Sequence, residues 1–209
     1  MASSEFKIGV LVSGRGTNLQ AIIDAVDNGE VAARIAVVLS NEQEAPALER
    51  AQKNGIESLW IDPKQFNGKT EYDRALSREL EQRGVHLVCL AGYMRILGPE
   101  FIRTFAGKII NIHPSLLPAF PGLNVQQKAI DYGVKFSGCT VHFVNEEVDG
   151  GPIILQAVVP VHDSDDADSL AERILIQEHL IYSRAIQMII ENRLHIDHRR
   201  VSSKESVIQ

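Results

Sequence analysis

The stretch KIINIHPSLLPAFPG (residues 108–122) decides how the rest of the chain is interpreted. It begins as an apolar run typical of a buried strand, and then places an amide, Asn111, and an imidazole, His113, at its end. Pro114 follows at once, and two further prolines stiffen the segment beyond it. Residues two positions apart in an extended segment project to the same side, so Asn111 and His113 face one direction. Two polar side chains at the end of a buried strand predict a functional site there.

Upstream of this stretch, short apolar runs alternate with helical patterns. Continuous runs of Val, Ile and Leu are typical of parallel strands that are covered on both faces. Segments with apolar residues three and four positions apart, ending in glycine, predict helices. The order β-α-β-α therefore predicts a doubly wound α/β sheet with right-handed crossovers. The predicted strands are residues 6–12, 34–39, 85–91 and 108–113, and the predicted helices are residues 18–29, 45–55 and 70–84.

Downstream, residues 136–144 and 151–161 predict two more strands. The link between them, NEEVDG, is too short for a crossover helix, so this pair should be antiparallel. Residues 168–190 predict one long amphipathic helix, with Ser169 and Glu172 as a capping box. Its apolar face is expected to carry Leu170, Ile174, Ile181, Ala185 and Met188.

The size and composition predict a single α/β domain spanning residues 1–209, with flexible tails at residues 1–5 and from about residue 196 to 209. A net charge of −6 argues against a general nucleic-acid binder. No apolar window is long enough for a membrane span and no targeting segment is evident, which predicts a cytoplasmic protein without a membrane partner. Cys89 and Cys139 lie in apolar runs, which predicts buried, reduced thiols.

The segment SGRGTN (residues 13–18) follows the first predicted strand and opens a helix. Gly14 and Gly16 allow a tight turn, and the first amides of the helix, with its dipole, favour an anion. Thr17 and Asn18 add side-chain donors, while neither a P-loop nor a complete dinucleotide fingerprint is present. The loop is interpreted as a site for one phosphate group; a purely structural turn is the alternative.

The strand-end pair and the segment NEEVDGG (residues 145–151) together indicate catalysis. Asn111 and His113 offer two donors that could converge on one developing oxyanion. Asp149 precedes two glycines that turn chemistry alone would explain, but those glycines also let the loop approach a ligand. If this loop folds over the end of the sheet, the Asp149 carboxylate would stabilise a protonated imidazole. A hydrogen-bonded structural histidine is the alternative.

Four segments, SGRGTNLQAIIDA, LAGYMRIL, NIHPSLLPAFPG and VHFVNEEVDGGPIILQ, together resemble the glycinamide ribonucleotide formyltransferases of purine biosynthesis. The resemblance covers residues 6–195 and implies a Rossmann-like formyltransferase fold. It implies transfer of the formyl group of 10-formyltetrahydrofolate, a co-substrate, to the amine of glycinamide ribonucleotide. It also implies that no metal is required, because a free amine is the nucleophile and a nitrogen is the leaving group. The enzyme is expected to be a monomer or a homodimer.

The resemblance assigns residues to each substrate. Asn111, His113 and Asp149 would be catalytic. The nucleotide would be held by Gly16, Thr17, Asn18, Gln177 and Glu178, although spacing alone predicts Glu178 to be a solvated helical charge. Apolar walls for the folate would come from Leu90, Ile96, Leu97, Ile109 and Val144. Folate-binding residues would be Lys69, Met94, Arg95, Ile96, Leu97, Asn111, Asn145, Glu146, Glu147, Val148 and Asp149.

Two positions depart from the family pattern. Many bacterial relatives carry arginine near Glu71, where this chain has Lys69, which can meet the glutamate tail of the folate only as a point charge. Asn124 stands where a histidine is familiar. His142 alternates with Val141 and Phe143 on a predicted strand, and is interpreted as a supporting residue near the site.

Three alternatives remain. A formyltetrahydrofolate deformylase uses a similar Asn, His and Asp, but is expected to carry an N-terminal regulatory domain for which this chain has no room. A methionyl-tRNA formyltransferase would need a further C-terminal domain and a basic surface. A non-catalytic nucleotide- or folate-binding protein would bind without turnover.

Overall fold

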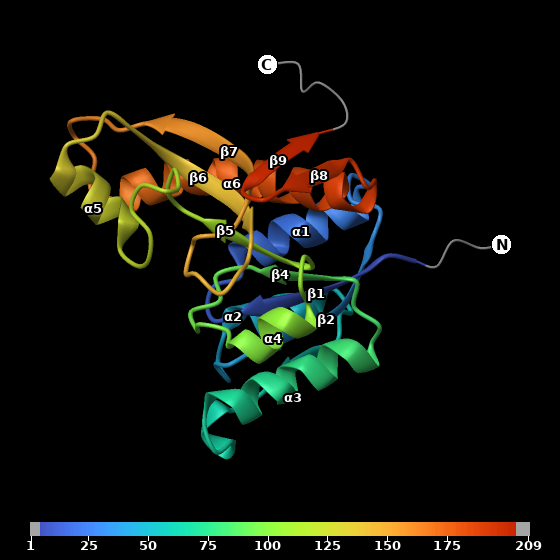
Figure 1. The fold of residues 1–209 in the computed structure, drawn as a ribbon. Coiled ribbons are helices and arrows are strands. Elements are labelled where there is room, and N and C mark those ends of the chain that lie inside the picture. Colours follow the sequence, from blue (N-terminus) through green and yellow to red (C-terminus); the bar gives the residue numbers. More distant parts are fainter. Residues whose placement is uncertain (1–4, 204–209) are drawn as a thin grey trace. The chain divides into compact units, whose positions relative to one another are not determined.

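A computed structural model of the protein describes residues 5–203 and contains one mixed sheet of seven strands, in the hydrogen-bonded order β3-β2-β1-β4-β5-β6-β7 (Figure 1). The sheet is mostly parallel and is flanked by helices, which confirms the predicted α/β class. The chain divides into two compact units between Ile110 and Asn111, and strand β5 (Ile109–His113) spans the division. That the whole chain acts as one formyltransferase domain stays a prediction.

The first unit contains the parallel strands that the apolar runs predicted. β1 pairs in parallel with β2 on one side and with β4 on the other, and β2 pairs in parallel with β3. Nearly all side chains of β1 and β4 are buried, which explains why both segments are apolar without alternation. The strands are β1 (Lys7–Val12), β2 (Arg34–Ser40), β3 (Ser58–Trp60) and β4 (Leu87–Leu90).

The helices of the first unit lie on both faces of these strands, with α1 on one face and α3 and α4 on the other (Figure 1). Gly29, Gly55 and Gly84 follow the ends of the three predicted helices at positive φ, which confirms the glycine stop signals. Strand β3, the 3-10 turn and α4 were not predicted, because each is too short to show a period. The elements are α1 (Thr17–Asp27), α2 (Pro46–Lys53), a 3-10 turn (Pro63–Gln65), α3 (Lys69–Gln82) and α4 (Pro99–Thr104).

The second unit is built around the predicted antiparallel pair. β6 (Phe136–Phe143) pairs antiparallel with β7 (Ile153–Pro160), and the long helix α6 (Ala167–Ile190) lies along both strands (Figure 1). A short helix, α5 (Val125–Tyr132), precedes β6 and contacts α6. It was not predicted, because only Val125 and Ala129 are buried and the apolar pattern is correspondingly weak.

The start of α6 differs from the sequence prediction. Asp166, not Ser169, is the N-cap: its side chain accepts from the Ser169 amide at 2.9 Å, and the Ser169 hydroxyl accepts from the Asp166 amide at 3.0 Å. The capping box is therefore Asp166–Ser169 rather than Ser169–Glu172. Of the predicted apolar face, Ile181 is only half-buried, because Tyr182 takes the buried position.

The C-terminal segment also differs from its prediction. Strands β8 (Leu194–Asp197) and β9 (Arg200–Ser203) form an antiparallel hairpin where a flexible tail was expected from about residue 196. The rest of that predicted tail, and residues 1–4 of the N-terminal one, lie outside the described residues.

Two further predictions concern the cysteines and membrane spans. Cys89 and Cys139 are buried thiols, as expected, and burial raises the pKa of the Cys139 thiol to about 12. Among the helices described, none combines the length and the apolarity that crossing a membrane would need. Location in the cytoplasm stays a prediction.

Candidate active site

In the first unit, the predicted phosphate loop joins β1 to α1. Gly16 is the N-cap of α1 at φ 73°, and a side chain there would place Cβ 2.6 Å from Ala47 Cβ, so only glycine fits without a shift. The loop is held from outside: Ala47 donates its amide to the Gly14 carbonyl at 3.1 Å, and Arg50 donates to the Arg15 carbonyl at 2.8 Å. The N-terminal amides of α1 are thus presented by a braced turn, which is the geometry that an anion site needs.

Ser13 joins this loop to the segment predicted to bind the folate. Its amide donates to the Gly92 carbonyl at 3.1 Å, and its hydroxyl accepts from the Met94 amide at 2.8 Å. The same hydroxyl donates to the Asn41 side chain at 2.6 Å. The side chains of Met94 and Ile96 are 68% and 65% exposed, whereas Leu97 is buried. Two exposed apolar side chains on a loop at the carboxyl end of β4 are suited to an apolar ligand.

Two predicted folate residues, Lys69 and Arg95, converge on one buried carboxylate of the first unit. Asp73 accepts from the Gly98 amide at 2.7 Å. Burial raises the pKa of the Asp73 carboxyl, while the Gly98 amide and the cations of Lys69 and Arg95 oppose that shift. The Arg95 guanidinium also lies 5.0 Å from the centre of the Tyr72 ring. Both cations are exposed and so remain accessible to an anionic ligand.

In the second unit, the structure brings together the residues predicted to be catalytic. The His113 Nδ1 atom lies 3.5 Å from Asp149 Oδ2, and the two side chains are only 6% and 11% exposed. The other ring nitrogen of His113, Nε2, lies 3.0 Å from the Phe120 carbonyl oxygen. Both ring nitrogens of His113 therefore lie near oxygen atoms that can accept a hydrogen bond.

His142 connects Asn111 to this pair. Its Nδ1 atom lies 2.8 Å from the Phe143 carbonyl oxygen, which can only accept, so Nδ1 carries the proton. Nε2 is then an acceptor, and the Asn111 side-chain amide donates to it at 3.2 Å. This contact fixes which way the Asn111 amide points. The sequence placed His142 near the site as a supporting residue, but gave no signal for its contact with Asn111.

The protonation of His142 should couple stability to pH. Burial, with a smaller contribution from the nearby His113, lowers the pKa of His142 below 6.5, and this outweighs the opposing effects of the Phe143 carbonyl and Asp149. Between that lowered value and 6.5 the unfolded chain binds the extra proton and the folded chain does not, so stability falls as the pH falls. We expect His142→Gln to lose less free energy of unfolding than the wild type between about pH 7 and pH 5. Urea unfolding across that pH range measures the free energy of unfolding of both proteins. If both lose the same free energy, the lowered pKa assigned to His142 is wrong.

The proline-rich segment after His113 is held by two side chains, Thr140 on β6 and Gln156 on β7. Thr140 donates to the Ser115 carbonyl at 2.7 Å and accepts from the Leu117 amide at 3.1 Å. Gln156 on β7 donates to the Leu117 carbonyl at 2.9 Å and to Thr140 Oγ1 at 3.0 Å. These bonds fix the segment that supplies the Phe120 carbonyl to His113.

The loop that carries Asp149 is equally constrained. Asp149 has φ 53°, in the left-handed region, and its Oδ2 atom accepts from the Gly122 amide at 2.8 Å. A Cβ atom on Gly151 would lie 1.7 Å from the Phe143 carbonyl oxygen, so the loop returns to the sheet where only glycine fits. Glu147 donates its amide to the Asn145 side chain at 3.1 Å, which closes an Asx turn in the same loop. Glu146, Glu147 and Val148, predicted to contact the folate, are exposed.

Glu178 on α6 is buried, not solvated. It is 6% exposed, and its charge raises the pKa of the neighbouring Cys139 thiol in addition to the effect of burial. Gln177 beside it is half-buried. The spacing-based interpretation of Glu178 as a solvated charge was therefore wrong. A buried carboxylate needs polar partners, so Glu178 is not a surface charge that merely interacts with solvent.

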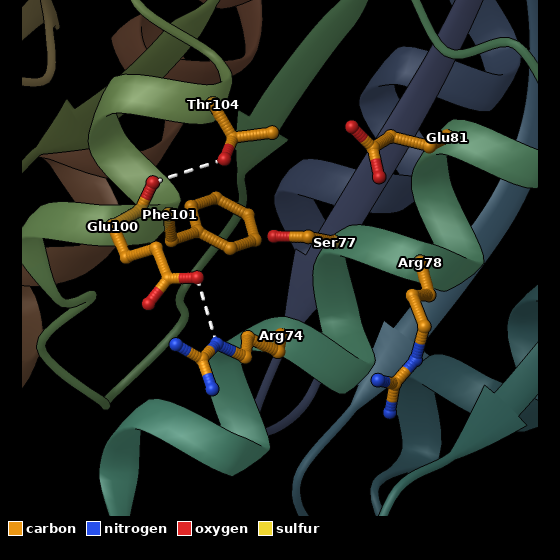
Figure 2. Close-up of a pocket in the computed structure, with 7 residues that line it drawn as sticks. All are labelled: Arg74, Ser77, Arg78, Glu81, Glu100, Phe101 and Thr104. Atoms are coloured by element: carbon orange, nitrogen blue, oxygen red, sulfur yellow. Dashed lines mark hydrogen bonds and ion pairs between the residues drawn. The ribbon is translucent and has the colours of Figure 1, made fainter.

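A surface hollow of about 250 Å³ lies elsewhere, on α3 and α4 (Figure 2). At its edge Arg74 donates to the Glu100 carboxylate at 2.7 Å, and the Thr104 hydroxyl donates to the Glu100 carbonyl at 3.0 Å. None of the predicted site residues lines it, so we assign it no part in the chemistry. Its lining residues are Arg74, Ser77, Arg78, Glu81, Glu100, Phe101 and Thr104.

Residues 6–186 match the formyl transferase family. The chain belongs to this family. It is 49% identical over 190 residues to phosphoribosylglycinamide formyltransferase of Haemophilus influenzae, covering 91% of this chain and 90% of that protein. Its fold matches the crystal structure of glycinamide ribonucleotide transformylase 1 from Symbiobacterium toebii with a TM-score of 0.95 and 51% identity, over 96% of this chain and 95% of that one.

Two further relatives differ from this chain, one in length and the other in sequence. It is 48% identical over 186 residues to the trifunctional purine biosynthetic protein adenosine-3 of Drosophila melanogaster, but it spans only 14% of the length of that protein. A formyltetrahydrofolate deformylase of Pseudomonas syringae shares the fold with a TM-score of 0.89 but only 29% identity, over 97% of this chain and 67% of that one. The deformylase is thus the more distant relative.

Proposed function

We infer that this formyl transferase moves the formyl group of 10-formyltetrahydrofolate to the amine of glycinamide ribonucleotide, giving N-formylglycinamide ribonucleotide and tetrahydrofolate, a step of purine biosynthesis. The observation that carries this inference is the convergence of Asn111, His113 and Asp149 through His142 in one shielded cluster. The names of the relatives with which the chain shares about half of its residues support the choice of acceptor.

The proposed reaction needs an oxyanion site and a route for one proton. The amine nitrogen attacks the formyl carbon, and the electrons of the C=O bond move to the oxygen. The Asn111 amide and the His113 imidazolium stabilise that oxyanion, for which His113 Nε2 exchanges the Phe120 carbonyl for the substrate oxygen. The bond from carbon to the folate nitrogen then breaks. The proton of the attacking amine passes to that nitrogen, and Asp149 assists this transfer through water.

Substrate binding is proposed to divide between the loops. Gly16, Thr17 and Asn18 hold the phosphate of the nucleotide at the braced start of α1, and Gln177 and Glu178 contact the rest of it. The folate takes the exposed Met94 and Ile96, with Lys69 and Arg95 available for its glutamate tail. The loop from Asn145 to Asp149 closes over its ring. Within residues 5–203 no group of three or more His, Cys, Asp or Glu side chains is arranged to hold a metal, and the metal-free reaction stays a prediction.

Replacing Thr17 and Asn18 together with alanine should raise KM for the nucleotide by about a hundredfold or more. Each hydrogen bond to a charged group contributes about 1.5–3 kcal/mol, and the phosphate would lose two of them. KM for the folate and kcat should change little, since the proposal gives neither residue a contact with the formyl group. Titrating each substrate separately measures the two KM values. A rise confined to the folate KM would show that this loop does not bind the phosphate of the nucleotide.

The inferred function is tested by the requirement for the amine. The enzyme is supplied with 10-formyltetrahydrofolate and with the nucleotide, with a nucleotide whose glycyl amine is replaced by a hydroxyl group, or with neither. Tetrahydrofolate should form only with the amine. Equal turnover in all three would identify water as the acceptor, and the protein would then be a deformylase.

A further inference from the structure

The β8–β9 hairpin of the second unit reaches the loop that carries Asp149. Its turn contains His198 and Arg199, and strand β9 lies against β7, which begins where that loop ends. The Arg199 Nη1 atom donates to the Gly150 carbonyl oxygen at 2.9 Å and lies 3.7 Å from Glu147 Oε2. One guanidinium thus contacts the loop on both sides of Asp149.

Gly150, which directly follows Asp149, makes several of the hydrogen bonds that hold this loop. Besides the contact from Arg199, its carbonyl oxygen accepts from the Asn145 side-chain amide at 3.4 Å. The Gly150 amide in turn donates to the Glu147 carbonyl at 3.1 Å. A charged donor makes a stronger hydrogen bond than a neutral one, and the planar guanidinium offers several donors in a fixed arrangement. Of these contacts, the one from Arg199 is charged and comes from outside the loop.

Asp149 needs such support because of its backbone. A non-glycine residue at φ 53° lies in a sparsely populated region, which persists only where the surroundings hold it. From that conformation its Oδ2 atom faces His113 Nδ1 at 3.5 Å. The peptide that follows Asp149 is held through the Gly150 amide, which donates to the Glu147 carbonyl, and the next peptide is held through the Gly150 carbonyl, which accepts from Arg199.

We propose that Arg199 is a positioning residue for formyl transfer, which holds residues 145–151 so that Asp149 stays against His113. It contacts no reacting atom and acts through the loop. This inference rests on the function proposed above for Asp149. It gives the C-terminal hairpin, which the sequence predicted as a flexible tail, a role in the reaction.

The test compares Arg199→Ala with Arg200→Ala, its exposed neighbour at the start of β9. We expect Arg199→Ala to lower kcat by about three- to tenfold, the effect of one charge-assisted hydrogen bond discounted for exposure. KM for the folate should rise and KM for the nucleotide should not. Arg199→Lys should recover part of the loss, because lysine can still donate to the Gly150 carbonyl. Arg200→Ala should match the wild type.

Hydrogen exchange of the backbone amides of residues 145–151 supplies a readout that does not depend on activity. Exchange should be faster in Arg199→Ala than in Arg200→Ala. If exchange or kcat is the same in both variants, the proposal is overturned. Failure of the proposed function would look different, because the wild type itself would then not transfer the formyl group to the nucleotide, whereas failure of this inference leaves wild-type transfer intact.

Discussion

Replacing His113 with alanine should lower kcat by about three orders of magnitude or more while leaving nucleotide binding nearly unchanged. The imidazolium is one of two donors proposed for the oxyanion, and removing one such donor costs about a hundred- to a thousandfold in rate. The variant also loses the partner through which Asp149 acts on the developing charge. A thousandfold loss corresponds to about 4 kcal/mol of transition-state stabilisation. Because His113 is buried at the end of β5, the variant must first be shown to fold, by urea unfolding.

The matched control is His162→Ala, because that imidazole is exposed and lies before α6. It should retain wild-type kcat. If His113→Ala folds and keeps more than about a tenth of the wild-type kcat, the oxyanion assignment is wrong, since so small an effect is below that of a single preorganised donor.

Replacing Asp149 with asparagine should lower kcat by about two orders of magnitude or more. Asparagine keeps an oxygen that can accept from the Gly122 amide, so the loop can retain its conformation. It removes the negative charge opposite His113 Nδ1, and with it both the stabilisation of the imidazolium and the group that assists the proton transfer. Because the cluster is shielded from solvent, the lost charge interaction is larger than it would be on the surface.

The conservative nature of this change makes the result informative. Asp149→Asn should bind the nucleotide with the wild-type Kd, measured by calorimetry, and lose turnover only. If Asp149→Asn instead weakens nucleotide binding by as large a factor as it lowers kcat, Asp149 acts in substrate binding and not in catalysis. Glu172→Gln, which removes an exposed carboxylate from α6 of the same unit, should change kcat little, and this control separates the role of Asp149 from a general loss of negative charge.

Local patterns predicted much of the fold because the elements that decide it are long or strongly apolar. β1 and β4 are buried on both faces, so they are continuous apolar runs, and each predicted helix of the first unit stops at a glycine with positive φ. The antiparallel pairing of β6 and β7 followed from the length of the link alone. α5 and the β8–β9 hairpin escaped prediction because they bury few side chains, and a pattern of burial is what periodicity detects.

The candidate site was predictable where polar residues break an apolar pattern. Asn111 and His113 stood out because a buried strand has no local reason to end in an amide and an imidazole. Asp149 could be suspected from its two glycines, but its contact with His113 depends on how a loop 36 residues further along the sequence returns to the sheet. The sequence placed His142 near the site, but its contact with Asn111 is recognisable only from the structure, as is the contact of the Phe120 carbonyl with His113.

The α6 start shows a different limit. The segment before the helix offers several aspartates and serines, all of which can cap, and the sequence alone favoured Ser169. In the structure Asp166 is the N-cap, because its side chain accepts from the Ser169 amide. The neighbouring Asp165 carboxylate instead accepts two hydrogen bonds from Arg173, at 2.7 Å and 2.8 Å. An ion pair between the loop and the helix thus influences which residue caps α6. Glu178 shows a separate limit, because only tertiary packing reveals that its side chain is buried.

The most direct test of the central claim follows the carbon atom itself. With enzyme in excess over 10-formyltetrahydrofolate that carries an isotopic label in its formyl group, and with glycinamide ribonucleotide present, a single turnover is stopped and its products are weighed by mass spectrometry. The account predicts that the label appears in the nucleotide, and that almost no labelled formate forms when the nucleotide is left out. Labelled formate in equal amounts with and without the nucleotide would contradict it.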